Sequence, residues 1–109
     1  MDRYQAATAY ADRIEHELRA LNVWESEPPP ASAYESEAAF FEDRMTFYQW
    51  LQFVLLPRVR EIGAQRGRFP RESSVGEYAV RELDGRDADC ALIEALSDFD
   101  DFIERKVKA

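Results

Sequence analysis

The 109-residue sequence has few of the residues that carry chemistry: it contains one histidine, His16, and one cysteine, Cys90. Single residues of these two types cannot supply the four ligands of a structural zinc site or a set of nucleophile, base and orienting group. A lone cysteine also excludes an internal disulfide, which favours a reducing compartment. We expect Cys90 to be a small core residue, and His16 to lie on the charged side of a helix, loosely paired with Asp12.

Long apolar runs and positive charge are also scarce. No stretch approaches the roughly 20 apolar residues of a membrane span, and the first residues do not form a signal peptide. We therefore expect a cytoplasmic protein without membrane contact. The 14 Lys and Arg residues are outnumbered by 22 Asp and Glu, for a net charge of −8. Because binding to a phosphate backbone needs a basic face, direct nucleic-acid binding is not expected.

Chain breakers are few, since only 4 glycines and 5 prolines interrupt a chain that is 46% hydrophobic. No strand alternation, repeat or low-complexity tract is visible, and apolar residues recur at helical spacing. The sequence predicts an all-α protein: one four-helix bundle-like domain over residues 1–109, with a kinked, largely buried central helix and a long proline-containing connection at residues 25–45.

The first helix is predicted from Asp2 to Leu21, where apolar residues step by three and four. Asp2 and Gln5 have the spacing of a capping box, and Glu15 with Arg19 forms a favourable pair one turn apart. The connection that follows contains Pro28-Pro29-Pro30, which prevents helical hydrogen bonding and favours an extended backbone. A stiff loop across one end of the bundle is preferred to a ligand for an aromatic-lined groove.

The central helix is predicted to begin at Thr46, which forms a second capping box with Gln49. Its next residues are apolar on nearly every side, as expected for a helix surrounded by others. Pro57 lies inside this pattern and lacks a donor for the preceding turn, so it predicts a kink rather than an end. The helix should end in the region from Gly63 to Gly67.

Two further helices are predicted in the C-terminal half. Ser74 and Glu77 have the spacing of a third capping box, and Asp84-Gly85 should close that short helix, whose boundaries are the least defined. Asp87 is expected to cap the last helix. Its apolar stripe contains Leu92, Leu96, Phe99 and Ile103, and its carboxylates Asp98, Asp100, Asp101 and Glu104 are interpreted as a solvated face.

Aromatic and apolar residues are densest in a block that contains Phe40, Phe41, Asp43, Met45, Trp50, Leu51, Gln52, Val54, Leu55, Pro57 and Arg58. This block resembles the YqcC-like family of small bacterial proteins of unknown function, and the likeness extends over the whole chain. The resemblance implies an all-α fold of four helices. It also implies an association with a tRNA pseudouridine synthase, whose name some relatives carry, but not that activity. Phe47 departs from a relative that has proline at the first helical position.

One stretch invites comparison with the catalytic aspartate loop of pseudouridine synthases, namely Arg81-Glu82-Leu83-Asp84-Gly85-Arg86. The comparison fails because Asp84 ends a predicted helix and no sheet is predicted to support it. No cofactor, metal ion or catalytic residue is expected, and the sequence favours a binding protein over an enzyme.

The strongest interaction signal is a run of five arginines against Glu61 alone: Arg58, Arg60, Arg66, Arg68 and Arg71. This patch could bind an acidic partner, although arginines also collect at helix C-termini because the helix dipole favours them there. Asp43 and Arg58 could instead form a partly buried pair across the core. A third interpretation is a small-molecule pocket lined by Trp24, Tyr34, Phe40, Phe41 and Trp50, with Gln49 and Gln52. Core packing is the safer assignment for those aromatic residues, and Tyr34, Phe40 and Phe41 should anchor the connection.

The sequence thus predicts a non-catalytic protein that binds another macromolecule. The expected partner is a protein, for which a tRNA-modifying enzyme such as a pseudouridine synthase is a candidate. The alternatives are an RNA-modifying enzyme in its own right and a helical protein that binds a small ligand. Partner identity, oligomeric state and the role of the Pro28-Pro29-Pro30 loop are left open.

Overall fold

The computed structural model describes residues 2–35, 45–83 and 87–108. Its long helices are α1 (Arg3–Ala20), a continuous rod at residues 47–65 and α5 (Cys90–Lys108), and α4 (Val75–Glu82) is shorter. The rod consists of α2 (Phe47–Trp50), a π-helical turn η3 (Leu51–Leu55) and α3 (Leu56–Gln65). Short 3-10 turns, η1 (Ala31–Glu35) and η4 (Asp87–Asp89), complete the elements. Within these three ranges there is no strand, which confirms the all-α prediction.

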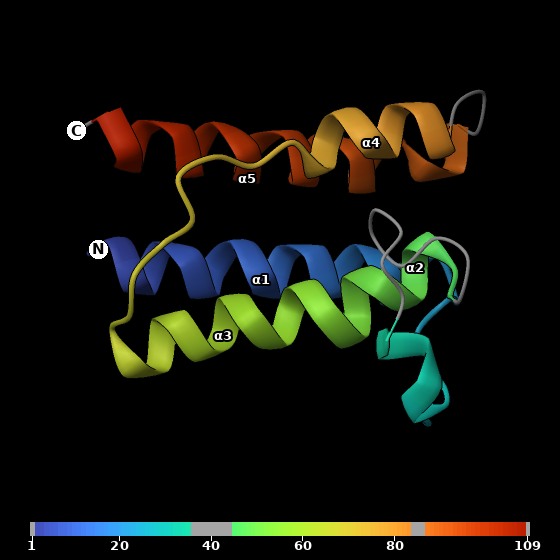
Figure 1. Cartoon of the computed structure of the whole chain (residues 1–109). Helices are drawn as coiled ribbons and strands as arrows, with labels where there is room; N and C mark the ends of the chain where they lie inside the picture. The colour runs from blue at the N-terminus through green and yellow to red at the C-terminus, as the bar shows by residue number, and fades with distance from the viewer. Residues whose placement is uncertain (1, 36–44, 84–86, 109) are drawn as a thin grey trace.

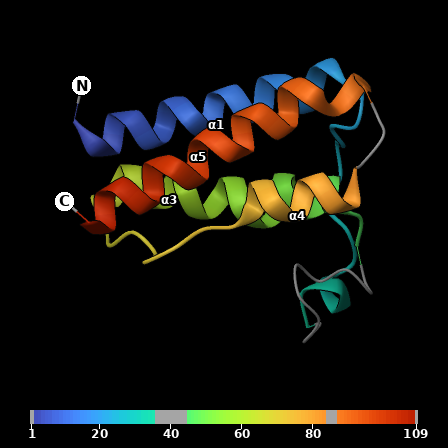
Figure 2. The same cartoon turned by 90° about the horizontal axis from the view of Figure 1, so that it is seen from above.

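The helices pack as a bundle in which α1 contacts both α3 and α5, while α4 lies against α5 (Figure 1). The start of α1, the end of α3 and the end of α5 lie at the same end of the bundle (Figures 1 and 2). The connection 66–74 runs from that end along the bundle to the start of α4. Because α4 covers only part of α5, the C-terminal part of α5 has the connection beside it and not a helix.

The core is formed by the predicted apolar stripes. From α1 it receives Tyr4, Ala7, Ala11, Ile14 and Leu18, and from α5 it receives Leu92, Ala95, Leu96, Phe99, Phe102 and Ile103, all of them buried. Trp50 at the start of the rod is 8% exposed, which confirms its predicted burial. The N-terminal half of the rod is enclosed, whereas Pro57, Arg58 and Glu61 face outward.

Both N-terminal capping boxes predicted in the first half of the chain are present. The Asp2 carboxylate accepts from the backbone N–H groups of Tyr4 and Gln5 at 2.9 and 2.8 Å, and the Gln5 side chain accepts from the Asp2 N–H. The Thr46 hydroxyl accepts from the Gln49 N–H at 3.0 Å, and Gln49 reciprocates. These local bonds satisfy donors that a helix start otherwise leaves unpaired.

The rod continues through Pro57, as predicted. The irregular geometry expected there takes the form of the π turn just before it, where the Leu56 N–H donates to the Leu51 carbonyl. The π turn thus lies next to a proline that removes one donor from the helix and crowds the carbonyl four residues before it. The rod ends at Arg66, which adopts a left-handed conformation with φ of 53°, rather than at a glycine.

A glycine on the rod sets the separation of α1 and α3. A Cβ atom on Gly63 would lie 2.7 Å from the Thr8 hydroxyl oxygen and 3.4 Å from the Tyr4 carbonyl oxygen. The absence of a side chain therefore lets the two helices approach closely at this point. Gly63 therefore lies in the helix interior, and the rod ends at Arg66, inside the predicted region from Gly63 to Gly67.

The start of α4 is capped from another helix. Ser74 is the N-cap residue but makes no side-chain cap bond, so the predicted capping box with Glu77 is wrong. Instead the Asp100 carboxylate of α5 accepts from the backbone N–H groups of Val75 and Gly76 at 3.0 and 2.7 Å. Asp100 is 9% exposed and does not belong to a solvated face, because its charge is used to close a neighbouring helix.

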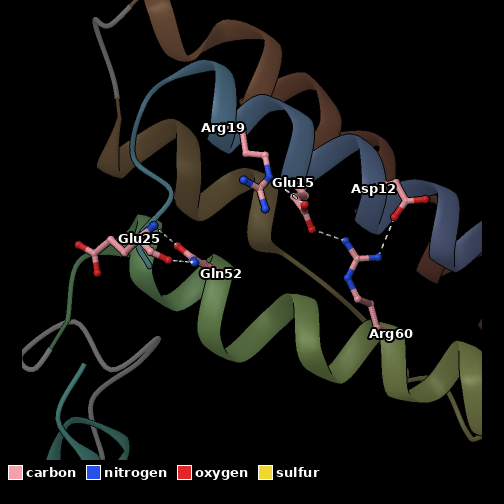
Figure 3. A network of polar contacts seen from close by, with 6 residues as sticks. All are labelled: Asp12, Glu15, Arg19, Glu25, Gln52 and Arg60. Carbon is pink, nitrogen blue, oxygen red and sulfur yellow. Dashed lines mark hydrogen bonds and ion pairs between the residues drawn. The ribbon is translucent and has the colours of Figure 1, made fainter. Parts of the chain in front are cut away.

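The proline-containing connection is tied down at its beginning. The buried Gln52 side chain accepts from the Glu25 N–H at 2.9 Å and donates to the Glu25 carbonyl at 2.7 Å (Figure 3). Farther along the connection than these two hydrogen bonds, Tyr34 is 39% exposed and so does not anchor the connection as expected. Phe40 and Phe41 lie outside the described residues.

Other predictions near the C-terminal helix are corrected. Cys90 is exposed at the start of α5 and is not a core residue. The helix begins at Cys90, after the 3-10 turn at Asp87–Asp89, so Asp89 and not Asp87 directly precedes it. Asp89 is buried and accepts from the Tyr48 hydroxyl at 2.7 Å. Asp84 and Gly85 lie outside the described residues. None of the helices in the described ranges is long and apolar enough to span a bilayer.

Candidate functional site

A groove of about 550 Å³ lies between α3, the connection 66–74 and α5. Its apolar lining includes Trp50, Val59, Ile62, Phe69, Phe99 and Ile103. This volume falls within the range of pockets that bind small molecules or the side chains of a partner. Trp50, a candidate pocket residue from the sequence, lines this groove together with residues of α3, the connection and α5.

The groove exists because α4 is short. With 8 residues against 19 in α5, α4 is about 12 Å long whereas α5 is about 28 Å long. The Asp100 bonds place the start of α4 beside the middle of α5. Beyond Asp100, α5 is accompanied by the connection instead of a helix, and a single extended chain covers less apolar surface than a helix does.

Aromatic contacts fix one wall of the groove. The Phe69 ring stacks on Tyr4 of α1 at a centroid distance of 5.4 Å and meets Phe102 of α5 edge-on at 5.7 Å. The Tyr4 hydroxyl also donates to the Gly67 carbonyl at 3.0 Å. These contacts hold the connection against the bundle, so the groove is a preformed feature of the fold.

The other end of the connection is held by Asp100. In addition to the two backbone donors of α4, the Ser73 hydroxyl donates to Asp100 Oδ1. Ser73 and Val75 both line the groove. One buried carboxylate therefore positions the wall of the groove and the start of α4 together, which sequence reasoning missed because the bond joins residues far apart in the chain.

Two arginines lie at the groove, Arg58 from α3 and Arg68 from the connection, together with the carboxylate of Glu72. Arg58, Arg68 and Arg71 are exposed. In the parts of the chain that the structure describes, no carboxylate lies within ion-pair distance of these three guanidinium groups. They are therefore available to an anionic group of a partner.

The remaining two arginines of the predicted patch are committed within the bundle. Arg60 donates to Asp12 and Glu15 of α1, each at 2.7 Å (Figure 3). Partial burial opposes the charged form of Arg60, but these carboxylates outweigh it and raise the pKa of the guanidinium. Arg66 lies 3.3 Å from Asp2 and stacks over the Tyr4 ring. Proximity in sequence thus does not produce one continuous patch.

Several other candidate residues take part in ordinary packing and pairing. The Arg19 guanidinium lies over the Trp24 ring, 4.4 Å from the ring centroid. The Gln52 side chain forms hydrogen bonds with the backbone of Glu25. Asp12 bonds to Arg60, and the His16 side chain is exposed. Among the described residues no group of three or more histidine, cysteine or acidic side chains could hold a metal ion.

The residues that carry the family resemblance are divided between core and surface. Leu51 and Gln52 are buried, whereas Pro57 is exposed. The proposed pair of Asp43 and Arg58 cannot be placed because Asp43, like Phe40 and Phe41, lies outside the described residues. Arg58 itself is exposed rather than partly buried across the core.

Comparisons with known proteins agree on one family. A family model described as tRNA pseudouridine synthase C matches residues 7–102. The uncharacterized protein YqcC of Escherichia coli is 30% identical over 74 residues, which cover 62% of this chain and 68% of that protein. An uncharacterized protein of Haemophilus influenzae is 29% identical over 69 residues, which cover 63% of this chain and 65% of that protein.

The fold agrees with a solved structure of one of these relatives. The solution NMR structure of E. coli YqcC superposes with a TM-score of 0.82 at 25% identity, over 95% of this chain and 90% of that one. Because the family model spans most of the sequence and the solved fold matches, the chain belongs to the YqcC-like family, whose model is described as tRNA pseudouridine synthase C.

Proposed function

We propose that this protein is a non-catalytic binding protein that receives a segment of a partner protein in the groove between α3 and α5. The observation that carries this proposal is an apolar groove, lined by Val59, Ile62 and Ile103, with two arginines beside it that have no carboxylate partner among the described residues. Apolar anchors supply most of the energy in such interfaces, and charges around them select the partner.

The partner that the family name suggests is a tRNA pseudouridine synthase. The family model carries the name of such an enzyme, and a small protein without an apparent catalytic group can carry an enzyme's name through association with it. We therefore propose an accessory role toward a tRNA-modifying enzyme. Arg58 and Arg68 would contact acidic side chains of the partner rather than the RNA, because the net charge of −8 opposes binding to a phosphate backbone.

The test uses purified protein and the tRNA pseudouridine synthase of the same cell, with affinity measured by calorimetry. Ile62→Glu places a charge in the groove on a half-buried position, and Val80→Glu places the same charge on an exposed residue of α4 outside it. We expect wild type and Val80→Glu to bind alike and Ile62→Glu to bind at least tenfold more weakly, because the apolar groove desolvates the new carboxylate. Circular dichroism confirms that both variants are folded.

The competing function is catalysis by this chain itself. Pseudouridine formation is therefore measured with the purified protein alone on unmodified tRNA, and we expect no product. Product formation would overturn the non-catalytic proposal. Absence of binding to the synthase, or equal binding by Ile62→Glu and Val80→Glu, would overturn the proposed role of the groove.

A further inference from the structure

The part of α5 that α4 does not cover has the length of a short helix. The start of α4 is bonded to Asp100, and α5 continues for eight residues to Lys108, a distance of about 12 Å. At 5.4 Å per turn this length corresponds to roughly two helical turns. The groove lies along this part of the bundle, with Ile103 of α5 and Ile62 of α3 among its lining residues.

The lining of the groove favours a partner segment that satisfies its own backbone. An extended segment would bring backbone N–H and C=O groups against apolar side chains such as Val59, Phe69 and Phe99, and these side chains offer them no hydrogen bonds. No strand edge is present in residues 2–35, 45–83 and 87–108 to pair with such a segment. A helix bonds its own backbone and presents apolar residues every three or four positions.

The charges at the groove favour acidic flanks on that helix. Arg58 comes from α3 and Arg68 from the connection, so two different walls contribute a cation, while Glu72 is on the connection with Arg68. The net charge of −8 attracts a basic helix from a distance, but at the groove both guanidinium groups would repel it. An acidic helix is attracted where the contact forms, which gives selectivity.

From these three observations we infer that the groove binds an amphipathic helix of about two turns whose apolar face is flanked by carboxylates that pair with Arg58 and Arg68. This inference rests on the proposed function and names the chemistry of the partner segment. The occupant completes the part of the bundle that α4 is too short to cover.

The probe is a capped synthetic 14-residue peptide with leucines on one helical face and glutamates on both flanks. Two matched peptides replace the glutamates by lysines, or keep the composition and scramble the leucine positions. Binding is followed by the fluorescence of Trp50, which lines the groove, in a Trp24→Phe background that removes the second indole. The acidic peptide should bind at least tenfold more tightly than either matched peptide in low salt, and the preference over the lysine peptide should shrink as salt rises.

Charge reversal on the protein completes the test. The double variant Arg58→Glu/Arg68→Glu should reverse the preference in favour of the lysine peptide, while Arg81→Glu, on α4 outside the groove, should preserve it. Equal binding of acidic and basic peptides, an unchanged preference in the double variant, or no binding of any helix would overturn the inference. If one of these outcomes occurred while Ile62→Glu still weakened synthase binding, the inferred acidic amphipathic helix would be wrong but the groove would remain the binding site. If Ile62→Glu had no effect on synthase binding, the proposed function would fail with it.

Discussion

Asp100 is predicted to contribute more to stability than any neighbouring carboxylate of α5, because it closes α4 from a distance. Its side chain accepts from two backbone N–H groups, those of Val75 and Gly76, and from the Ser73 hydroxyl. Asp100→Ala removes the cap and leaves two buried donors without a partner. A lost cap costs about 0.5–2 kcal/mol, and unpaired buried donors raise the total to about 2–3 kcal/mol.

The assay is urea unfolding monitored by circular dichroism, with Asp101→Ala as the matched control. Asp101 is the next residue of α5 and is exposed, so its removal should change the free energy of unfolding by less than about 0.5 kcal/mol. For a protein of this size the Asp100→Ala loss corresponds to a fall in Tm of roughly 9–13 °C. Asp100→Asn should fall between the two, since one acceptor oxygen remains. Equal stability of Asp100→Ala and Asp101→Ala would show that the Asp100 carboxylate does not stabilise the start of α4.

Three further predictions concern stability and titration. Gly76→Ala should destabilise the protein by about 1–3 kcal/mol in urea unfolding, because the new Cβ would lie 2.8 Å from the Cα of Ser97; unchanged stability would mean that α4 and α5 can separate freely. Gln52→Leu should cost about 1–2 kcal/mol by removing both bonds to Glu25, and a neutral result would show that water replaces them. The pKa of Asp2 should lie below its usual value because the Gln5 N–H bonds to its carboxylate, so the stabilisation from this cap is complete at neutral pH and is lost as pH falls through the lowered pKa; an ordinary pKa in an NMR titration would contradict it.

Local sequence signals predicted most of the fold. The boxes of Asp2 with Gln5 and Thr46 with Gln49 were predictable because both partners lie within one helical turn. Burial of the stripes in α1 and α5 follows from their periodicity. The helical rod also continues past Pro57, since apolar spacing on both sides outweighs one missing donor.

The failures involve bonds between distant parts of the chain. Ser74 has the local signature of a cap, but Asp100 occupies that role from another helix, and no spacing rule relates residues so far apart. Arg60 was assigned to a surface patch because the two carboxylates of α1 that bind it are more than forty residues away.

The candidate groove was only partly predictable. Trp50 and the arginines Arg58 and Arg68 were identified from sequence, but their meeting with Phe69 and Ile103 depends on where α4 begins. That position is determined by the bonds to Asp100, which the sequence does not reveal.

Mapping the contact surface of the protein with NMR tests whether the groove receives the partner. The tRNA pseudouridine synthase of the same cell is added to isotopically labelled protein, and changes in backbone and methyl signals are recorded. We expect the largest changes to cluster on Ile62, Phe69 and Ile103 at the groove, with little change around His16 on the exposed face of α1. Changes concentrated on α1, or no changes at saturating synthase, would contradict it.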